Sequence, residues 1–192
     1  MNLRQQARGK PCMVRLHGSD GGATKSKTQL RRQSIPFDQL ADALQYNPNS
    51  GVFNWKKRLS NCIHAGDVAG NLHRGYVRIR VFGQLFPAHE LAWRFASGEW
   101  PKQEIDHING IKSDNRICNL RDVSHAINGQ NQRRARRDNK LGLLGVIAYG
   151  DGYAAKIMKN GNTTYLGKHR TPEKAHAAYL KAKRTMHEGC SI

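Results

Sequence analysis

The sequence predicts an α+β chain built from small antiparallel sheets and short helices. Val and Ile alternate with Arg over residues 77–81, which is the period of a half-buried strand. Asn-Gly pairs at 109–110 and 160–161 are strong signals for hairpin turns. The Thr-Pro-Glu sequence at 171–173 predicts a helix start, because it offers a capping side chain, a proline suited to the first turn and an acidic group. The length of 192 residues allows one medium domain or two small ones.

The chain is strongly basic, with 32 Lys and Arg against 14 Asp and Glu and a formal net charge of +18. Such a charge attracts polyanions, nucleic acid first and anionic membrane surfaces second. No apolar run reaches the roughly 18 residues of a membrane span, and no secretion signal is visible, so we expect a cytoplasmic protein without a membrane partner. The cysteines form no Cys-x-x-Cys pair and are expected to be reduced thiols. The lack of a Gly-x-x-x-x-Gly-Lys loop argues against a nucleotide cofactor.

The N-terminal part is expected to contain an arm, a helix, a sheet and a second helix. Residues 1–34 are basic and have no apolar period, so we expect a disordered arm that is either a solvated tail or a source of phosphate contacts. Residues 35–46 show the apolar face of a short helix. A small antiparallel sheet is expected across 52–86, and a helix over 89–97 that ends at Gly98.

The stretch from Glu104 to Asn131 predicts strand, turn, strand and helix. A β-like run ends in Asp106-His107, the Asn-Gly turn follows, and residues 117–120 form a second apolar run before Ser124, which can cap a helix. This order would bring Asp106, His107 and a helix residue together. A carboxylate can hold a hard divalent metal ion, and a histidine, which ordinarily titrates near neutral pH, suits a general base. The combination is what metal-assisted phosphodiester cleavage needs.

Residues 106–121, DHINGIKSDNRICNLR, resemble the HNH nuclease motif of the ββα-metal fold, in the variety found in phage and intron homing endonucleases. The preceding AHELAWRFASGEWP (88–101) is similar to the helix that commonly comes before that motif. The resemblance implies a ββα-metal core, one magnesium or manganese ion and double-stranded DNA as substrate. It implies that His107 is the general base and that Asp106 binds the metal.

Two further positions are carried over from the motif. Asn128 stands where the third motif residue falls on the helix, and an asparagine that binds metal replaces the usual histidine there. His125 lies three residues earlier on the same helix and is the alternative ligand. Asn119 matches the central asparagine that braces the loop, a role for which Asn115 competes.

The region after Asn131 predicts a linker and a second DNA-binding part. Residues 133–141 are too basic to bury, and as a linker they are either solvated or lie on phosphates; we favour phosphate contact by Arg133, Arg134, Arg136 and Arg137. Residues 142–190 predict three strands and one helix, and they resemble the ethylene-response-factor (APETALA) type of DNA-binding domain, which lays its sheet in the major groove. Outward alternation suggests Tyr149, Lys156, Lys159 and Tyr165 as DNA contacts, unless they are only sheet-face residues.

We therefore expect four regions: an arm (1–34), an HNH nuclease domain (35–132, with its motif at 86–132), a linker (133–141) and an ethylene-response-factor-type domain (142–190). The basic strand of the first sheet, with Arg78 and Arg80, is expected to help place the duplex. The expected function is a metal-dependent, homing-type DNA endonuclease of phage type, acting in the cytoplasm of a bacterial host. The alternative is a catalytically inactive DNA-binding or regulatory protein. A single motif per chain fits nicking by a monomer or double-strand cutting by a homodimer.

Overall fold

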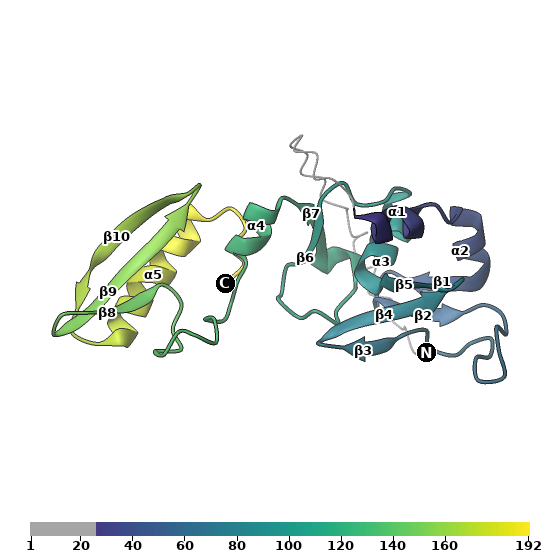
Figure 1. Cartoon of the computed structure of the whole chain (residues 1–192), viewed down its shortest axis with the longest axis horizontal. Coiled ribbons are helices and arrows are strands. Elements are labelled where there is room, and N and C mark those ends of the chain that lie inside the picture. Colours follow the sequence, from purple (N-terminus) through teal and green to yellow (C-terminus); the bar gives the residue numbers. More distant parts are fainter. Residues whose placement is uncertain (1–25) are drawn as a thin grey trace, which may run out of the picture. The chain divides into compact units, whose positions relative to one another are not determined.

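The computed structural model describes residues 26–192, and this part of the chain is a mixed α+β protein. Its internal contacts define two compact units, one of residues 26–101 and 112–121 and the other of residues 102–111 and 122–192. The predicted fold class is confirmed at the level of several small antiparallel sheets combined with helices (Figure 1). Between residues 26 and 192, no helix is both long and apolar enough to cross a membrane.

The first helix lies within the segment that we expected to be a disordered arm. Helix α1 (Lys27–Gln33) begins with a capping box, in which the Ser26 hydroxyl accepts from the backbone N–H of Gln29 and the Gln29 side chain accepts from the N–H of Ser26. Arg32 in this helix forms an ion pair with Glu90 at 3.3 Å. The expectation was therefore wrong for residues 27–33, because local capping and a buried ion pair order them. The rest of the expected arm, residues 1–25, lies outside the described residues.

Helix α2 (Phe37–Ala43) is shorter than the sequence predicted. The chain leaves the helix at Leu44 and enters strand β1 (Leu44–Asn47), which pairs antiparallel with β2 (Val52–Trp55). The ring of Tyr46 stacks on that of Phe53 with centroids 4.8 Å apart. This aromatic contact across the two strands outweighs the helical pattern of apolar residues that continued to Tyr46.

The three-stranded sheet of the first unit has the order β3-β4-β5, with strands Asn71–His73, Tyr76–Val81 and Gln84–Pro87. Helix α3 (Ala88–Ser97) follows directly and ends at Gly98, whose φ of 81° is the left-handed value that favours glycine at a helix end. Ile79 of β4 and Phe86 of β5 are fully buried. The alternation at 77–81 and the helix end at Gly98 are confirmed.

The central stretch contains β6 (Glu104–His107), a 3₁₀ turn η1 (Ile117–Asn119), β7 (Leu120–Val123) and α4 (His125–Gln130). Strand β6 pairs with β7. The order of strand, strand and helix is as predicted, and Ser124 caps α4 by accepting from the N–H of Ile127. The second strand was predicted over 117–120, but it begins only at Leu120. The Asn-Gly turn closes back on His107, and the chain then forms a separate loop before it reaches β7.

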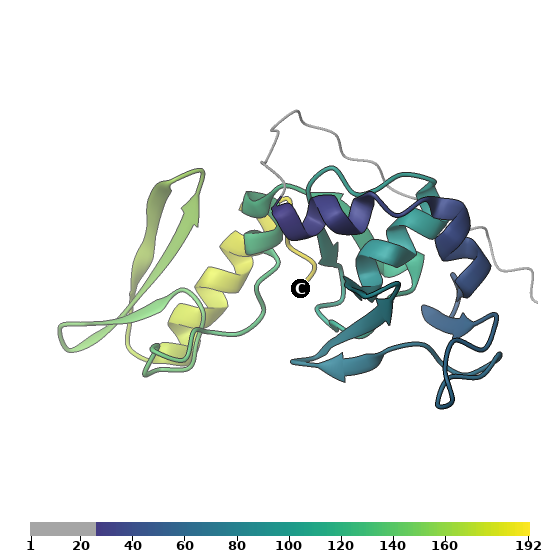
Figure 2. The ribbon, with the colours of Figure 1, turned by 45° about the vertical axis from the view of Figure 1, so that its right-hand side comes forward.

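The last part of the chain is a three-stranded antiparallel sheet with one helix, as Figures 1 and 2 show. The strands are β8 (Val146–Tyr149), β9 (Gly152–Lys159) and β10 (Asn162–His169), in the order β10-β9-β8. Helix α5 (Pro172–Met186) has Thr171 as its N-cap, as the sequence predicted. Val146, Ala155 and Ala175 form the core between helix and sheet. The small alanine side chains allow the helix to lie close to the strands.

Candidate active site and nucleic-acid interface

Strand β6 carries two acidic side chains and ends in a histidine. Because alternate residues of a strand point to opposite faces, Glu104 and Asp106 share one face while His107 points to the other. Asp106 is 6% exposed and His107 is 5% exposed, whereas the Glu104 side chain is 45% exposed. The strand therefore offers a buried carboxylate and a buried imidazole in different directions.

The entry to β6 is fixed by Asp122 of β7. The backbone N–H of Lys102 donates to Oδ2 of Asp122 at 2.7 Å, and that of Gln103 donates to Oδ1 at 2.9 Å. Bonds to an ionised carboxylate are stronger than neutral ones, so Asp122 anchors the chain just before the strand. Sequence reasoning did not single out this residue. An acidic residue within the otherwise apolar end of β7 was the available signal.

Helix α4 presents a row of polar side chains, spaced three apart, to the acidic face of β6. His125 Nδ1 lies 2.8 Å from Oε1 of Glu104, and Asn128 Nδ2 donates to Oε2 of Glu104 at 2.7 Å. Partial burial acts to raise the pKa of Glu104, but the hydrogen bonds from Asn128 and His125 outweigh it and lower the pKa. Because its N–H donates to Glu104, the Asn128 amide has its oxygen, Oδ1, as the atom able to bind a cation.

Asn131, at the C-terminal cap of α4, continues the same spacing and contacts Asp106. Its Nδ2 lies 3.1 Å from both carboxylate oxygens of Asp106 and donates to the carbonyl of His107 at 2.9 Å. Asn131 is itself only 7% exposed. This residue was missed from the sequence, where only its position three residues after Asn128 pointed to a shared helix face.

The predicted site residues of β6 and α4 therefore lie in one compact unit. The structure places Asn128 against Glu104 and Asn131 against Asp106. The alternative ligand, His125, has a 91% exposed side chain and is bound to Glu104. Among residues 26–192, no group of three or more His, Cys, Asp or Glu side chains is arranged to hold a metal ion.

In the loop before β7, the side chain of Asn119 contacts a residue five positions earlier in the chain. Its Nδ2 donates to the carbonyl of Asp114 at 2.8 Å. Arg116 adds two bonds to the Asp114 carboxylate, at 2.8 and 2.6 Å. Asn115, the competing candidate, is 2% exposed, and its amide donates to the carbonyl of Ser113 at 3.4 Å. Bracing of the loop by Asn119 stays a prediction.

Two predicted DNA contacts, Arg78 and Arg80, lie on strand β4 of the first unit. They point away from Ile79, which is buried on the opposite face. Both line a groove of about 610 Å³ together with Trp55 and His73. The charged residues of this groove are the two arginines and Asp67, and most of its other lining is apolar or uncharged.

The linker arginines differ in their surroundings. All four are exposed, but Arg133 donates through its guanidinium to the carbonyl of Ile108 at 3.0 Å and to Ser191 at 2.9 Å. Arg133 therefore has a role inside the fold, whereas the contacts predicted for Arg134, Arg136 and Arg137 stay predictions.

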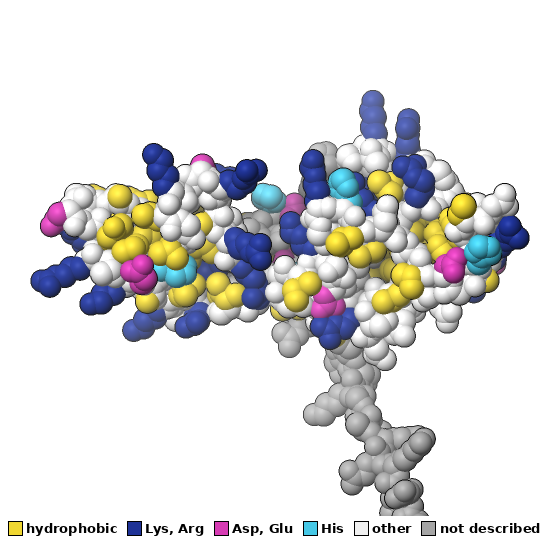
Figure 3. Space-filling view, turned by 90° about the horizontal axis from the view of Figure 1, so that it is seen from below, with side chains coloured by type: hydrophobic (Ala, Val, Ile, Leu, Met, Phe, Trp, Pro, Cys, Tyr) yellow, Lys and Arg dark blue, Asp and Glu magenta, His cyan; other side chains and the backbone are white. Residues whose placement is uncertain are grey.

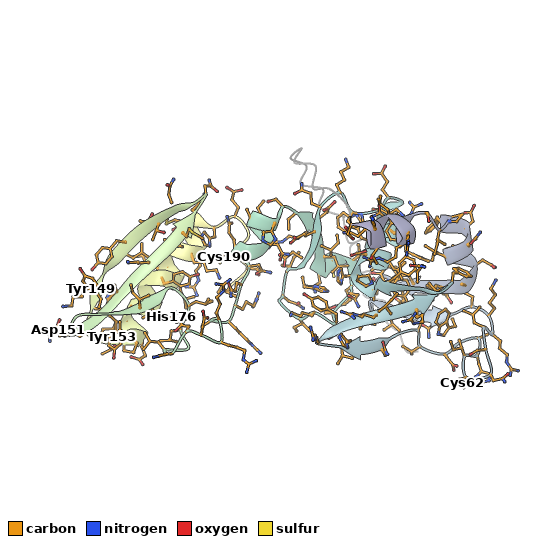
Figure 4. The ribbon with its side chains drawn as sticks, in the orientation of Figure 1. Cys62, Tyr149, Asp151, Tyr153, His176 and Cys190 are labelled. Carbon is orange, nitrogen blue, oxygen red and sulfur yellow. The ribbon has the colours of Figure 1, made fainter. Side chains whose placement is uncertain are left out.

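The face of the β8–β10 sheet that α5 does not cover is partly apolar. Tyr149 and Tyr165 are 53% and 52% exposed, with ring centroids 6.4 Å apart, and Lys156 pairs with Tyr165 across the strands. Figure 4 shows where Tyr149 lies in this sheet. In Figure 3, hydrophobic side chains of this part are flanked by protruding Lys and Arg side chains.

Lys159 does not belong to this face, which corrects its expected outward position. It has the same parity along β9 as buried Ile157, and its Nζ lies 3.6 Å from Oε1 of Glu188, which follows α5. Lys156 points outward, as the alternation along the strand predicted. Lys159 lies three residues further along β9, an odd number, so its side chain must point to the opposite face of the sheet.

Comparison with known proteins gives one match. Residues 86–130 match the family described as HNH endonuclease. No curated protein and no solved structure matches the chain significantly. The matched segment runs from β5 to the end of α4 and includes Asp106, His107 and Asn128. The part of the chain that carries the buried Asp-His pair is thus similar to an HNH endonuclease domain.

Proposed function

We propose that this chain is a metal-dependent endonuclease that hydrolyses phosphodiester bonds of double-stranded DNA. The observation that carries the proposal is the buried Asp106-His107 pair at the end of β6, in which the Asp106 carboxylate accepts from the side chain of Asn131, the C-terminal cap of α4. The match of this segment to HNH endonucleases supports the same reading.

The donor set suits a hard divalent ion. Asp106 offers a carboxylate, and the bond from Asn128 to Glu104 orients the Asn128 amide so that its oxygen can act as a ligand. Oxygen donors of this kind favour magnesium or manganese. When bound, such an ion offsets the charge of the scissile phosphate and stabilises the leaving 3′ oxygen.

The remaining steps fall to side chains of the protein. His107, the last residue of β6, is assigned as the general base that takes a proton from the attacking water. Asn119 braces the loop that leads to β7 through its bond to Asp114. Ligand and base are thus neighbouring residues at the end of one strand.

The basic and aromatic surfaces supply DNA binding. A net charge of +18 favours a polyanion, and Arg78, Arg80 and the exposed linker arginines offer phosphate contacts. The uncovered face of β8–β10, with its two tyrosines and Lys156, suits contact with a groove. Resemblance to phage-type homing nucleases supports a site-specific enzyme encoded by a phage and active in the bacterial cytoplasm.

The test is incubation of the purified chain with supercoiled plasmid in Mg²⁺, Mn²⁺ or a chelator. We expect nicked or linear DNA only with metal, and no cutting by Asp106→Ala. Asp151→Ala is the matched control. The Asp151 side chain is 91% exposed in the turn between β8 and β9, so we expect this variant to cut DNA normally. DNA binding without cutting in either metal would favour the inactive DNA-binding alternative. The ratio of nicked to linear product against protein concentration separates a monomer that nicks from a dimer that cuts both strands.

A further inference from the structure

The C-terminal end of α4 and the residues just after it are hydrogen-bonded to α5 and to the segment that follows α5. The backbone N–H of Gly189 donates to Oε1 of Gln130 at 3.0 Å. Nζ of Lys183, a residue only 1% exposed, is bonded to the carbonyl of Gln132. Both partners flank Asn131, the residue that contacts Asp106. All these residues belong to the second compact unit.

Gly189 fits against α4 without room for a side chain. A Cβ built there would lie 2.2 Å from the carbonyl oxygen of Ile127 and 3.0 Å from Cβ of Gln130. A Cβ essentially never approaches a backbone oxygen as closely as 2.2 Å, so any larger residue must push the segment away from the helix. Figure 4 marks Cys190, the next residue, in this segment.

Ser191 completes the contact at Asn131 itself. Its hydroxyl lies within hydrogen-bonding distance of both Oδ1 of Asn131 and the carbonyl of Ile108, and its one proton can be donated to either of them, while Arg133 donates to the Ser191 oxygen at 2.9 Å. An asparagine amide has one accepting and one donating end, and the two are nearly equal in shape. A donor at Oδ1 therefore fixes the amide so that Nδ2 faces the Asp106 carboxylate.

We propose that residues 189–191 are a positioning element of the metal site, with Ser191 acting through Asn131 on Asp106. The inference rests on the proposed function, because it assigns Asp106 as a ligand. Without Ser191, Oδ1 of Asn131 loses this donor, and the amide is held through the bonds of Nδ2 to Asp106 and to the His107 carbonyl, which fixes the orientation of Asp106 less tightly. The same segment ties the helix of the β8–β10 domain to the nuclease motif, so the part expected to bind DNA and the cleavage site share one set of contacts.

The test measures metal binding as well as cutting. Ser191→Ala, Ser191→Thr and Gly189→Val are each titrated with Mn²⁺ alone by electron paramagnetic resonance, and cleavage is followed over the same range of Mn²⁺ concentrations. Loss of a group that orients a metal ligand typically changes metal affinity by about 10- to 100-fold, so we expect Ser191→Ala and Gly189→Val to raise the Mn²⁺ dissociation constant by about tenfold or more. Ser191→Thr keeps the hydroxyl and should restore binding. Glu188→Ala is the control, because that side chain is 74% exposed and should leave Mn²⁺ affinity unchanged.

The outcomes separate this inference from the proposed function. Wild-type Mn²⁺ affinity in both Ser191→Ala and Gly189→Val overturns the inference, even if the protein cuts DNA. Weakened Mn²⁺ binding in these two variants, with recovery in Ser191→Thr, supports it. If the wild-type chain binds Mn²⁺ through Asp106 but does not cut DNA, the proposed function fails while the positioning role stands. DNA affinity measured in chelator should be the same for all variants, which separates a loosened metal site from a misfolded protein.

Discussion

Asn128 donates through its side-chain amide to Glu104 at 2.7 Å, and this bond decides which end of the amide can serve a metal ion. The Nδ2 end of the amide is bonded to Glu104, so its oxygen, Oδ1, is the atom that can bind a metal ion. His125 bonds to the other oxygen of the same carboxylate at 2.8 Å. Glu104 is thus placed to orient Asn128 without itself being one of the predicted ligands.

Glu104→Ala should weaken the metal site. Removal of the carboxylate frees the Asn128 amide to rotate, and loss of an outer partner typically costs about 10- to 100-fold in metal affinity or activity. The measurement is the Mg²⁺ concentration that gives half-maximal cleavage. Glu99→Ala, at an exposed acidic residue just before this stretch, is the control. An unchanged Mg²⁺ requirement in Glu104→Ala would show that Asn128 is oriented by other contacts or is not a ligand.

Gly51→Ala should destabilise the first unit more than Gly66→Ala. Both glycines have positive φ, 73° and 93°, so both alanines incur a backbone cost of about 1–2 kcal/mol. A Cβ at Gly51 would also lie 2.5 Å from the backbone nitrogen of Arg116, in the loop that Asn119 braces, whereas nothing lies within 4 Å at Gly66. We expect Gly51→Ala to lower the free energy of unfolding, measured in urea, by about 1 kcal/mol more than Gly66→Ala does. Equal losses would mean that the loop does not pack on Gly51 in solution.

Lys156→Ala and Lys159→Ala should differ in DNA binding, although both lysines lie on β9. Lys156 is on the sheet face beside Tyr165, and Lys159 is on the α5 side near Glu188. Each phosphate contact contributes about 0.9 to the slope of log Kobs against log salt. We therefore expect the slope to become shallower by about that amount for Lys156→Ala only, as measured by fluorescence anisotropy of a labelled duplex. A larger effect from Lys159→Ala would place the DNA on another surface.

The local elements were the part of the fold most accessible from the sequence. Ser124, Thr171 and Gly98 were identified because capping is decided by residues within one turn. The strand beginning at Leu44 was not, because its apolar residues also fit a helix and only pairing with Trp55 settles the choice. Strand β7 was placed too early for a related reason: the loop at 108–119 is shaped by contacts such as that of Asn119 to Asp114.

The candidate site likewise contains residues that the sequence predicted and residues that it did not. Asp106 and His107 were predicted from their place at the end of a strand, and Asn128 from the resemblance to the HNH motif. Asn131 and Glu104 were not, because their importance comes from which side chain meets which across β6 and α4. Ser191 could not be predicted, since it contacts Asn131 from a segment 60 residues further along the chain, after α5. Register and long-range packing, rather than local pattern, decide such contacts.

The most direct test of the central proposal compares two histidines of the same motif. His107 is buried at the end of β6, whereas His125 is exposed on α4, so His107→Ala and His125→Ala separate a general base from a surface residue. Cleavage is measured in single-turnover reactions with saturating Mg²⁺, and duplex affinity is measured in chelator. We predict that His107→Ala slows cleavage by about 10²- to 10⁴-fold with unchanged affinity, while His125→Ala retains most of the rate. Wild-type cleavage by His107→Ala would contradict the assignment of His107 as the base and, with it, the proposed mechanism.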